Sequence, residues 1–176
     1  MPVSYRIHIW VALGLAATSL AVAVLTLVPG APVVPGAVAF GLFGSALPVF
    51  GLGVLRCVRA GVTVRGPDFL WIYVDTPRWV LVCAVAMTAG AVTCLVGGDD
   101  PGGGRPVKEA GGYYLKEKGK REAVSRETYV SAVKAEQRWF DTGGTVFLAN
   151  AAVLAGAAYR DDKGRTARIT VTPPAP

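Results

Sequence analysis

The sequence predicts an all-α integral membrane protein: a bundle of four transmembrane helices with a small extracytoplasmic β-hairpin and an amphipathic helix. Three observations predict this class. Hydrophobic residues make up 52% of the 176 residues and charged residues only 17%, whereas a soluble domain carries about 25% charged residues. The 22 glycines and 12 prolines argue against long soluble helices. The apolar residues gather in four blocks without Asp, Glu, Lys or Arg.

The four blocks define the expected organisation of the chain. They cover residues 7–28, 33–55, 79–96 and 143–159. A span needs about 20 apolar residues to cross the hydrocarbon core, and its backbone polar groups must be paired within the segment, so each block is expected to be helical. Residues 1–97 then hold three spans and a cytoplasmic loop at 56–78. Residues 98–142 form an extracytoplasmic segment, and 160–176 a disordered cytoplasmic tail.

The orientation rests on basic residues close to the span ends. Four spans place both termini on one side, and the 18 Lys and Arg residues divide equally between the two sides. Within about 15 residues of a span, the side that holds the termini keeps all of its basic residues, whereas the other side keeps fewer than half. We therefore expect a multi-pass protein of the bacterial plasma membrane with both termini in the cytoplasm.

The extracytoplasmic segment contains recognisable folding signals. Residues 112–115 and 121–124 are predicted to be strands around a turn at Gly119. Ser125 is a predicted N-cap for an amphipathic helix over residues 126–140. The glycine pair at 143–144 predicts a hinge between this helix and the fourth span, because glycine weakens helices.

The apolar side of this outer helix has little of its own chain to pack against. The hairpin, the membrane surface or a partner is therefore expected to cover it. The candidate partner-interface residues are Tyr113, Tyr114, Tyr129, Val133, Trp139 and Phe140.

The predicted membrane interior contains few ionisable or polar side chains. His8 is the one ionisable side chain within the four blocks. Pumps and ion-coupled transporters usually carry intramembrane acids or bases, so the sequence argues against those classes. Asn150 is the most polar interior residue and is expected to make an interhelical hydrogen bond.

The remaining segments offer no reactive site. In the cytoplasmic loop, Gly66-Pro67-Asp68 predicts a hairpin whose second strand covers residues 69–74. The three cysteines are expected to be free thiols, and a single histidine excludes a His-rich metal site. We predict no catalytic, metal or cofactor-binding residue, and no nucleic-acid partner because no binding motif accompanies the net charge of +6.

The outer segment also carries a pattern seen in other chains. Its elements are Tyr113-Tyr114, Gly119, Val124-Ser125, Tyr129, Ala132-Val133, Arg138 and Phe140, ahead of the last span. Together with the Ala, Gly, Val, Pro and Arg bias, this pattern resembles small uncharacterised multi-pass membrane proteins of actinobacterial type. The resemblance implies the span layout and carries no activity to transfer.

These observations favour a non-enzymatic membrane protein that presents its outer hairpin and helix to a membrane or envelope protein, to the envelope itself or to a second copy of the chain. One alternative is a transporter subunit or small carrier for a neutral or apolar solute, motivated by Asn150 and glycine-lined helix faces. A second alternative is a lipid-acting membrane enzyme, for which no catalytic constellation is visible.

Overall fold

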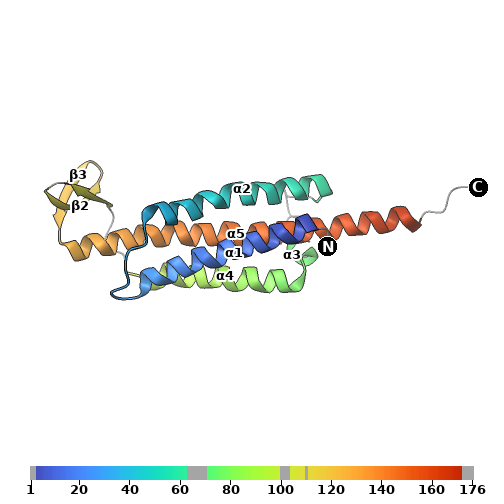
Figure 1. Cartoon of the computed structure of the whole chain (residues 1–176), viewed down its shortest axis with the longest axis horizontal. Helices are drawn as coiled ribbons and strands as arrows, with labels where there is room; N and C mark the ends of the chain where they lie inside the picture. The colour runs from blue at the N-terminus through green and yellow to red at the C-terminus, as the bar shows by residue number, and fades with distance from the viewer. Residues whose placement is uncertain (1–2, 63–70, 100–103, 110, 172–176) are drawn as a thin grey trace, which may run out of the picture.

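The computed structural model describes residues 3–62, 71–99, 104–109 and 111–171. Within these ranges the elements are α1 (Val3–Leu27), α2 (Gly36–Ala60), α3 (Trp71–Asp75), α4 (Arg78–Gly97), β1 (Arg105–Glu109), β2 (Gly112–Glu117), β3 (Lys120–Val124) and α5 (Arg126–Val171). Figure 1 shows the four long helices side by side, with the sheet at one end of the molecule and the start of α1 at the other. We call these the sheet end and the terminal end.

Four helices in the described part of the chain are long and apolar enough to cross a membrane. They are α1 and α2 with 25 residues each, α4 with 20 residues, and the 35 residues of α5 from Arg126 to Arg160. The expectation of a mostly helical protein with four helices of this kind is confirmed. The first three agree with the predicted spans to within a few residues, because charge-free apolar blocks are a strong signal.

The central element is α5. In its most apolar stretch 72% of the residues are buried, compared with 44% in α1, 17% in α2 and 22% in α4. Each of the other three long helices packs against α5, and α1 also contacts α2 and α4 (Figure 1). The protein is therefore arranged as three helices around one, and the core lies along α5.

Small residues allow the helices to approach α5 closely. Its fully buried residues include Ala149, Ala151, Ala152, Ala155, Ala157 and Ala158. On α2, a Cβ added to Gly53 would lie 3.3 Å from the carbonyl oxygen of Ala151. Close backbone approach of this kind is a main source of helix association where lipid removes most of the hydrophobic driving force.

The predicted hinge at Gly143 and Gly144 is wrong, because α5 runs through both glycines as one helix. A Cβ on Gly144 would lie 3.1 Å from Ser19 Oγ of α1 and 3.6 Å from Phe43 Cα of α2. A Cβ on Gly143 would lie 3.5 Å from the Phe43 ring. The glycines make room for two neighbouring helices, and this packing holds the helix straight where its intrinsic propensity is low.

The predicted disordered tail is also wrong for residues 160–171, which continue α5 as helix. Residues 172–176 lie outside the described part of the chain. Adding a residue to an existing helix is easy compared with starting a new one. A packed α5 therefore extends beyond its apolar stretch into a polar sequence.

The loop between α2 and α4 departs from the predicted hairpin. Residues 63–70, which include most of that hairpin, lie outside the described ranges. Residues 71–75 form the helical turn α3 instead of a strand. Ile72 is buried, and the Thr76 hydroxyl donates hydrogen bonds to the carbonyls of Ile72 at 2.7 Å and of Val153 on α5 at 3.1 Å. Docking on α5 decides the conformation of this short segment.

The sheet contains the predicted hairpin and one further strand. β2 pairs antiparallel with β3, and β1 pairs antiparallel with the other edge of β2. The β2–β3 turn has positive φ at Lys118 (47°) and Gly119 (83°), the conformation that twisted two-residue hairpins favour. The predicted pair of strands is present, while β1 was not predicted.

The start of α5 is capped as its sequence predicts. The amide of Thr128 donates a hydrogen bond to Ser125 Oγ at 3.1 Å. We expect Ser125→Ala to cost about 1 kcal/mol locally and to speed amide hydrogen exchange in the first turn of α5 roughly fivefold. Ser131→Ala, inside the same helix, is the matched control and should leave those rates unchanged. Equal rates in the Ser125 variant and the native protein would contradict this role.

Candidate functional site

Two of the predicted interface residues face each other inside the chain. The rings of Tyr113 on β2 and Tyr129 on α5 lie with centroids 4.9 Å apart. Lys108 Nζ lies 5.8 Å from the centroid of the Tyr113 ring. The hairpin thus covers part of the apolar side of α5, which was one of the three expected covers.

Phe140 is also used within the bundle. Its ring packs edge-on against the rings of Phe40 and Phe43 on α2, with centroid distances of 4.9 and 5.3 Å. Val133 is half-buried, and Trp139 is 63% exposed. Of the residues near this end of α5, Trp139 is therefore the large side chain that remains available to lipid or a partner.

The sheet has two unlike faces. Successive side chains of a strand point to opposite faces, so Tyr114 and Lys116 lie on the face away from Tyr113 and α5. We call this the distal face. The strand register places two rows of three residues on it. The apolar row is Val107, Tyr114 and Ala123, and the basic row is Arg105, Lys116 and Arg121.

The two faces of the sheet differ in net charge. Arg121 forms an ion pair with Glu109 at 2.9 Å, and within the described residues neither Arg105 nor Lys116 has an acidic partner. The opposite face balances its charges, with two bases and two acids: Lys108, Lys120, Glu117 and Glu122. The distal face is therefore a net basic surface beside an apolar strip.

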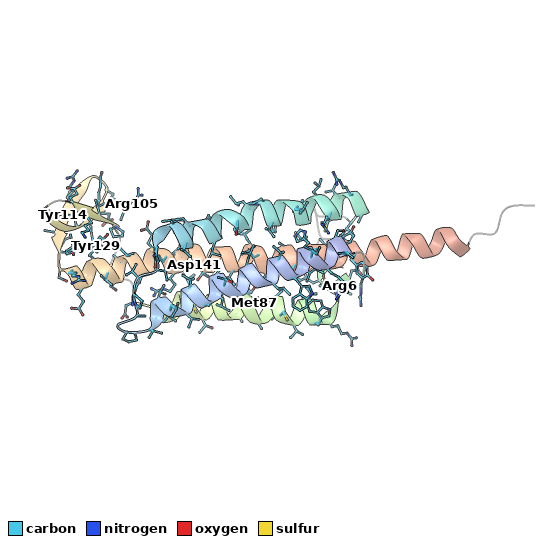
Figure 2. The ribbon with its side chains drawn as sticks, in the orientation of Figure 1. Arg6, Met87, Arg105, Tyr114, Tyr129 and Asp141 are labelled. Atoms are coloured by element: carbon cyan, nitrogen blue, oxygen red, sulfur yellow. The ribbon has the colours of Figure 1, made fainter. Side chains whose placement is uncertain are left out.

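A second feature, a buried polar cluster, was missed in the sequence. It comprises Ser19 on α1 and five residues of α5 that are at most 6% exposed: Gln137, Arg138, Asp141, Thr142 and Thr145. Asp141 is fully buried, and Figure 2 places it along α5 within the bundle, away from Tyr114 and Arg105. The predicted fourth block begins at Gly143 and leaves Asp141 outside the interior, whereas the fourth span-length helix, Arg126–Arg160, includes Asp141 and buries it.

Two hydroxyl groups donate hydrogen bonds mainly to the backbone carbonyl of Asp141 and less to its carboxyl group. Ser19 Oγ lies 2.9 Å from the Asp141 carbonyl oxygen and 3.2 Å from Asp141 Oδ1. The Thr145 hydroxyl donates to the same carbonyl at 2.8 Å. Asp141 Oδ2 is buried and has no hydrogen-bond partner among the described residues.

Arg138 is one of the members of this cluster nearest the sheet end. Its Nη2 donates a hydrogen bond to the carbonyl of Asp99 at 2.8 Å, and a side chain on Gly98 would overlap the Arg138 guanidinium. Arg138 also lines a pocket of about 340 Å³ formed by the ends of α1 and α4 and the first turns of α5. Other residues of that pocket are Thr26, Gly30, Ser131 and Lys134.

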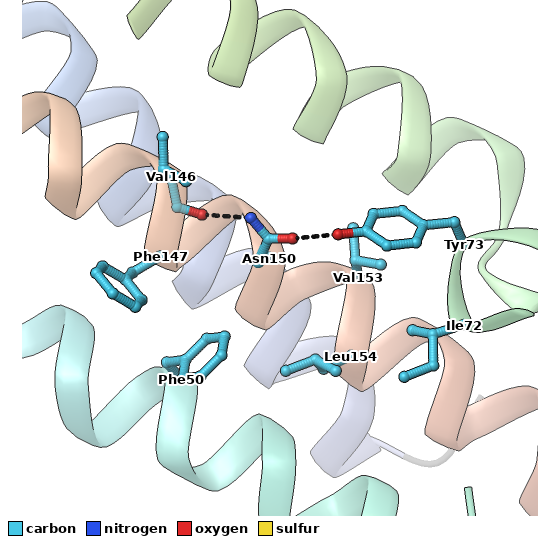
Figure 3. A pocket seen from close by; sticks show the side chains of 8 residues that line it. All are labelled: Phe50, Ile72, Tyr73, Val146, Phe147, Asn150, Val153 and Leu154. Atoms are coloured by element: carbon cyan, nitrogen blue, oxygen red, sulfur yellow. Dashed lines mark hydrogen bonds between the residues drawn. The ribbon is translucent and has the colours of Figure 1, made fainter. Parts of the chain in front are cut away.

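Asn150 makes a hydrogen bond between helices. Tyr73 of α3 donates its hydroxyl hydrogen to Asn150 Oδ1 at 2.7 Å, and Asn150 Nδ2 donates to the carbonyl of Val146 at 2.8 Å (Figure 3). Cavities of about 170 and 310 Å³ flank Asn150 on either side, and Val153 lines both. The surrounding side chains are mainly apolar, so the hydrogen bond between Asn150 and Tyr73 pairs two polar groups that have few other polar neighbours.

Metal-ligating side chains and thiols do not gather into a site in the described part of the chain. Among the described residues, no three of His, Cys, Asp and Glu come together as metal ligands would. Cys57, Cys83 and Cys94 are free thiols, as expected. Cys57 Sγ lies 3.2 Å from the carbonyl oxygen of Leu154 and helps to join α2 to α5.

No protein-family model, curated protein or solved structure matches the chain. The structure itself defines the class of protein: a mostly helical chain with four helices long and apolar enough to cross a membrane.

Proposed function

We propose that the chain is a non-enzymatic integral membrane protein that presents its sheet to a protein partner in the cell envelope. In this proposal the four long helices span the plasma membrane. The sheet end lies outside the cytoplasm, and both termini lie inside. The four apolar helices and the clustering of basic residues near the spans on the side of the termini support this arrangement.

The distal face of the sheet is the observation that carries the proposal. Like charges directly opposite one another on neighbouring strands are destabilising, yet Arg105, Lys116 and Arg121 occupy three neighbouring strands in register. Packing on α5 uses the other face, so the basic row contributes nothing to that contact. A basic row in which Arg105 and Lys116 have no acidic partner among the described residues suits recognition of an anionic surface.

The apolar row beside the basic row indicates which class of partner fits the distal face. Tyr114 is flanked by Val107 and Ala123 across the sheet. A Tyr amid small apolar groups is typical of protein interfaces, where aromatic residues and Arg are enriched. We therefore infer a protein partner whose surface combines acidic and apolar side chains.

The test is site-specific photo-crosslinking in intact cells, with the photoreactive residue at position 114. We expect a discrete crosslinked product that is lost in the double variant Arg105→Ser with Lys116→Ser, because the favourable charge pairing is removed. The control is Lys118→Asn with Lys120→Ser, which lowers the net charge by the same amount near the β2–β3 turn and keeps a residue tolerant of positive φ. A product retained in both double variants, or absent from the parent protein, would refute the proposal.

A further inference from the structure

Asp141 lies apart from the proposed partner surface and is a site in its own right. We propose that Asp141 is a proton-binding site, occupied by a proton in the folded protein at neutral pH and able to release it towards the pocket at the sheet end. Ionisable groups inside membrane-spanning segments are rare and are commonly functional.

The position of Asp141 is deep in the bundle. Its neighbour Ser19 lies eight residues from the end of α1 at Leu27, which is about 12 Å along the helix axis. The next residue, Thr142, donates to the carbonyl of Ala91, six residues or about 9 Å from the end of α4. The carboxyl group is therefore well inside the sheet end of the helices that surround it.

Asp141 has no ion-pair partner among the described residues. The helices α1, α2 and α4 contain no Asp or Glu, and their basic residues, Arg6, His8, Arg56, Arg59 and Arg78, all lie near the terminal end. Ser19 of α1 and Thr145 of α5 contact Asp141 directly. The residues next to it on α5 meet Phe43 of α2, at Gly143 and Gly144, and Ala91 of α4, at Thr142, and Arg138 lies near Cys94 of α4. Arg138 donates to the carbonyl of Asp99, and within the described ranges no ion pair includes Asp141.

The hydrogen bonds around Asp141 suit a neutral acid better than an ion. Ser19 has one hydroxyl hydrogen, and it is shared between Asp141 O and Oδ1. The Thr145 hydrogen goes to Asp141 O. An ionised carboxylate has about four acceptor sites, whereas a carboxylic acid carries its own donor. Burying an unpaired charge costs free energy, and a bound proton removes that cost because it neutralises the carboxylate.

A route towards the pocket lies along one face of α5. Gln137 and Arg138 precede Asp141 by four and three residues, which places both side chains one turn nearer the sheet end on its side of the helix. Gln137 Oε1 is buried without a hydrogen-bond partner in the described structure. Arg138 lines the 340 Å³ pocket. Gln137 Nε2 donates to the carbonyl of Val34, which leaves Oε1 as a buried acceptor one turn from the acid that can bind an intervening water.

Release of the proton is expected to loosen the contact between α1 and α5. A carboxylate would need new donors, and Ser19 and Thr145 can supply them only by giving up their bonds to the Asp141 carbonyl. Protonation would thus be linked to helix packing, and stability would fall as the pH rises because the folded state binds more protons than the unfolded state.

The test uses a hydrophobic carbodiimide, which adds to protonated carboxyl groups in apolar surroundings, on the full chain in lipid nanodiscs. Labelled peptides are quantified by mass spectrometry over a pH series. We expect labelling of Asp141 at neutral pH that declines as the pH is raised, and no labelling of the exposed acids Asp75 and Asp99. Asp141→Asn should abolish labelling of that peptide, and the Asn variant should lose the pH dependence of thermal stability seen in the parent protein.

Two further arms keep the inference falsifiable. Ser19→Ala removes the donor that favours the ionised form, so labelling should persist to higher pH, and this arm remains informative if Asp141→Asn fails to fold. Absence of labelling at neutral pH in the folded parent protein would overturn the proposal. Suppression of labelling by Na⁺ but not by choline at constant pH would also overturn it, in favour of a metal-cation site.

Discussion

Gly144→Ile should destabilise the helix bundle more than any other single substitution considered. A Cβ at this position would lie 3.1 Å from Ser19 Oγ and 3.6 Å from the backbone of Phe43, so a branched side chain must push α1 or α2 away from α5. Overpacking in a well-packed interior costs about 1–3 kcal/mol, and the backbone neighbour on α2 cannot rotate aside. We expect a lower thermal midpoint in detergent or nanodiscs, monitored by light scattering and intrinsic fluorescence.

Gly51→Ile on α2 is the matched control. Nothing lies within 4 Å of a Cβ added there, and the residue is exposed on the bundle surface. The same change in side chain should therefore leave the midpoint within a degree or two of the parent protein. Equal destabilisation by the two variants would show that α1, α2 and α5 do not pack as described.

Leu148→Ala should have the second large effect. Leu148 is fully buried on α5 and packs with Ala16 of α1 and Ala46 of α2. Removing its side chain leaves a cavity between three helices, and substitutions of this kind cost about 2–5 kcal/mol in soluble cores. We expect a value near the lower end, about 2 kcal/mol, because lipid reduces the contribution of apolar transfer. Chemical unfolding in mixed micelles measures this difference.

Leu47→Ala provides the control for the same chemical change. Leu47 on α2 is 57% exposed, so its truncation exchanges a contact with lipid for another and leaves no cavity. Little change in the free energy of unfolding is expected. A loss in the Leu47 variant as large as in the Leu148 variant would contradict the central position of α5.

The positions of the helices could be predicted from composition. An apolar block without charges that enters a membrane must pair its own backbone groups, and a helix does this. The blocks at 7–28, 33–55 and 79–96 coincide with α1, α2 and α4 to within a few residues. The Ser125 cap and the β2–β3 turn are local signals that depend on residues close in sequence. These features were predictable because short-range chemistry determines them.

Asp141 was not predictable as a buried group, since its burial depends on partners far along the chain. It is followed by Thr142 and by the glycine pair at 143–144, which suggested the edge of a span and a hinge. The position of Ser19 on α1, 122 residues away, places the carboxyl group inside. The only available signal was the length of the fourth span: extending it by one helical turn towards its start would have placed Asp141 inside it.

β1 and α3 escaped prediction for related reasons. The strand sequence Arg-Pro-Val-Lys-Glu has no apolar alternation, and its pairing with β2 supplies the order that its own residues lack. In α3, Ile72 and Tyr73 have strong strand propensity, but contacts with α5 outweigh that preference. Tertiary packing therefore decides both segments.

The continuity of α5 has a mechanical consequence. A helix of 46 residues is about 69 Å long, and it joins the sheet directly to the far end of the protein without a joint. Close contacts of Gly53 and Gly144 hold α1 and α2 against α5, so α5 is expected to move as one rigid rod together with the helices around it. A displacement at the sheet end is therefore expected to reach the far end of α5 without bending at a joint.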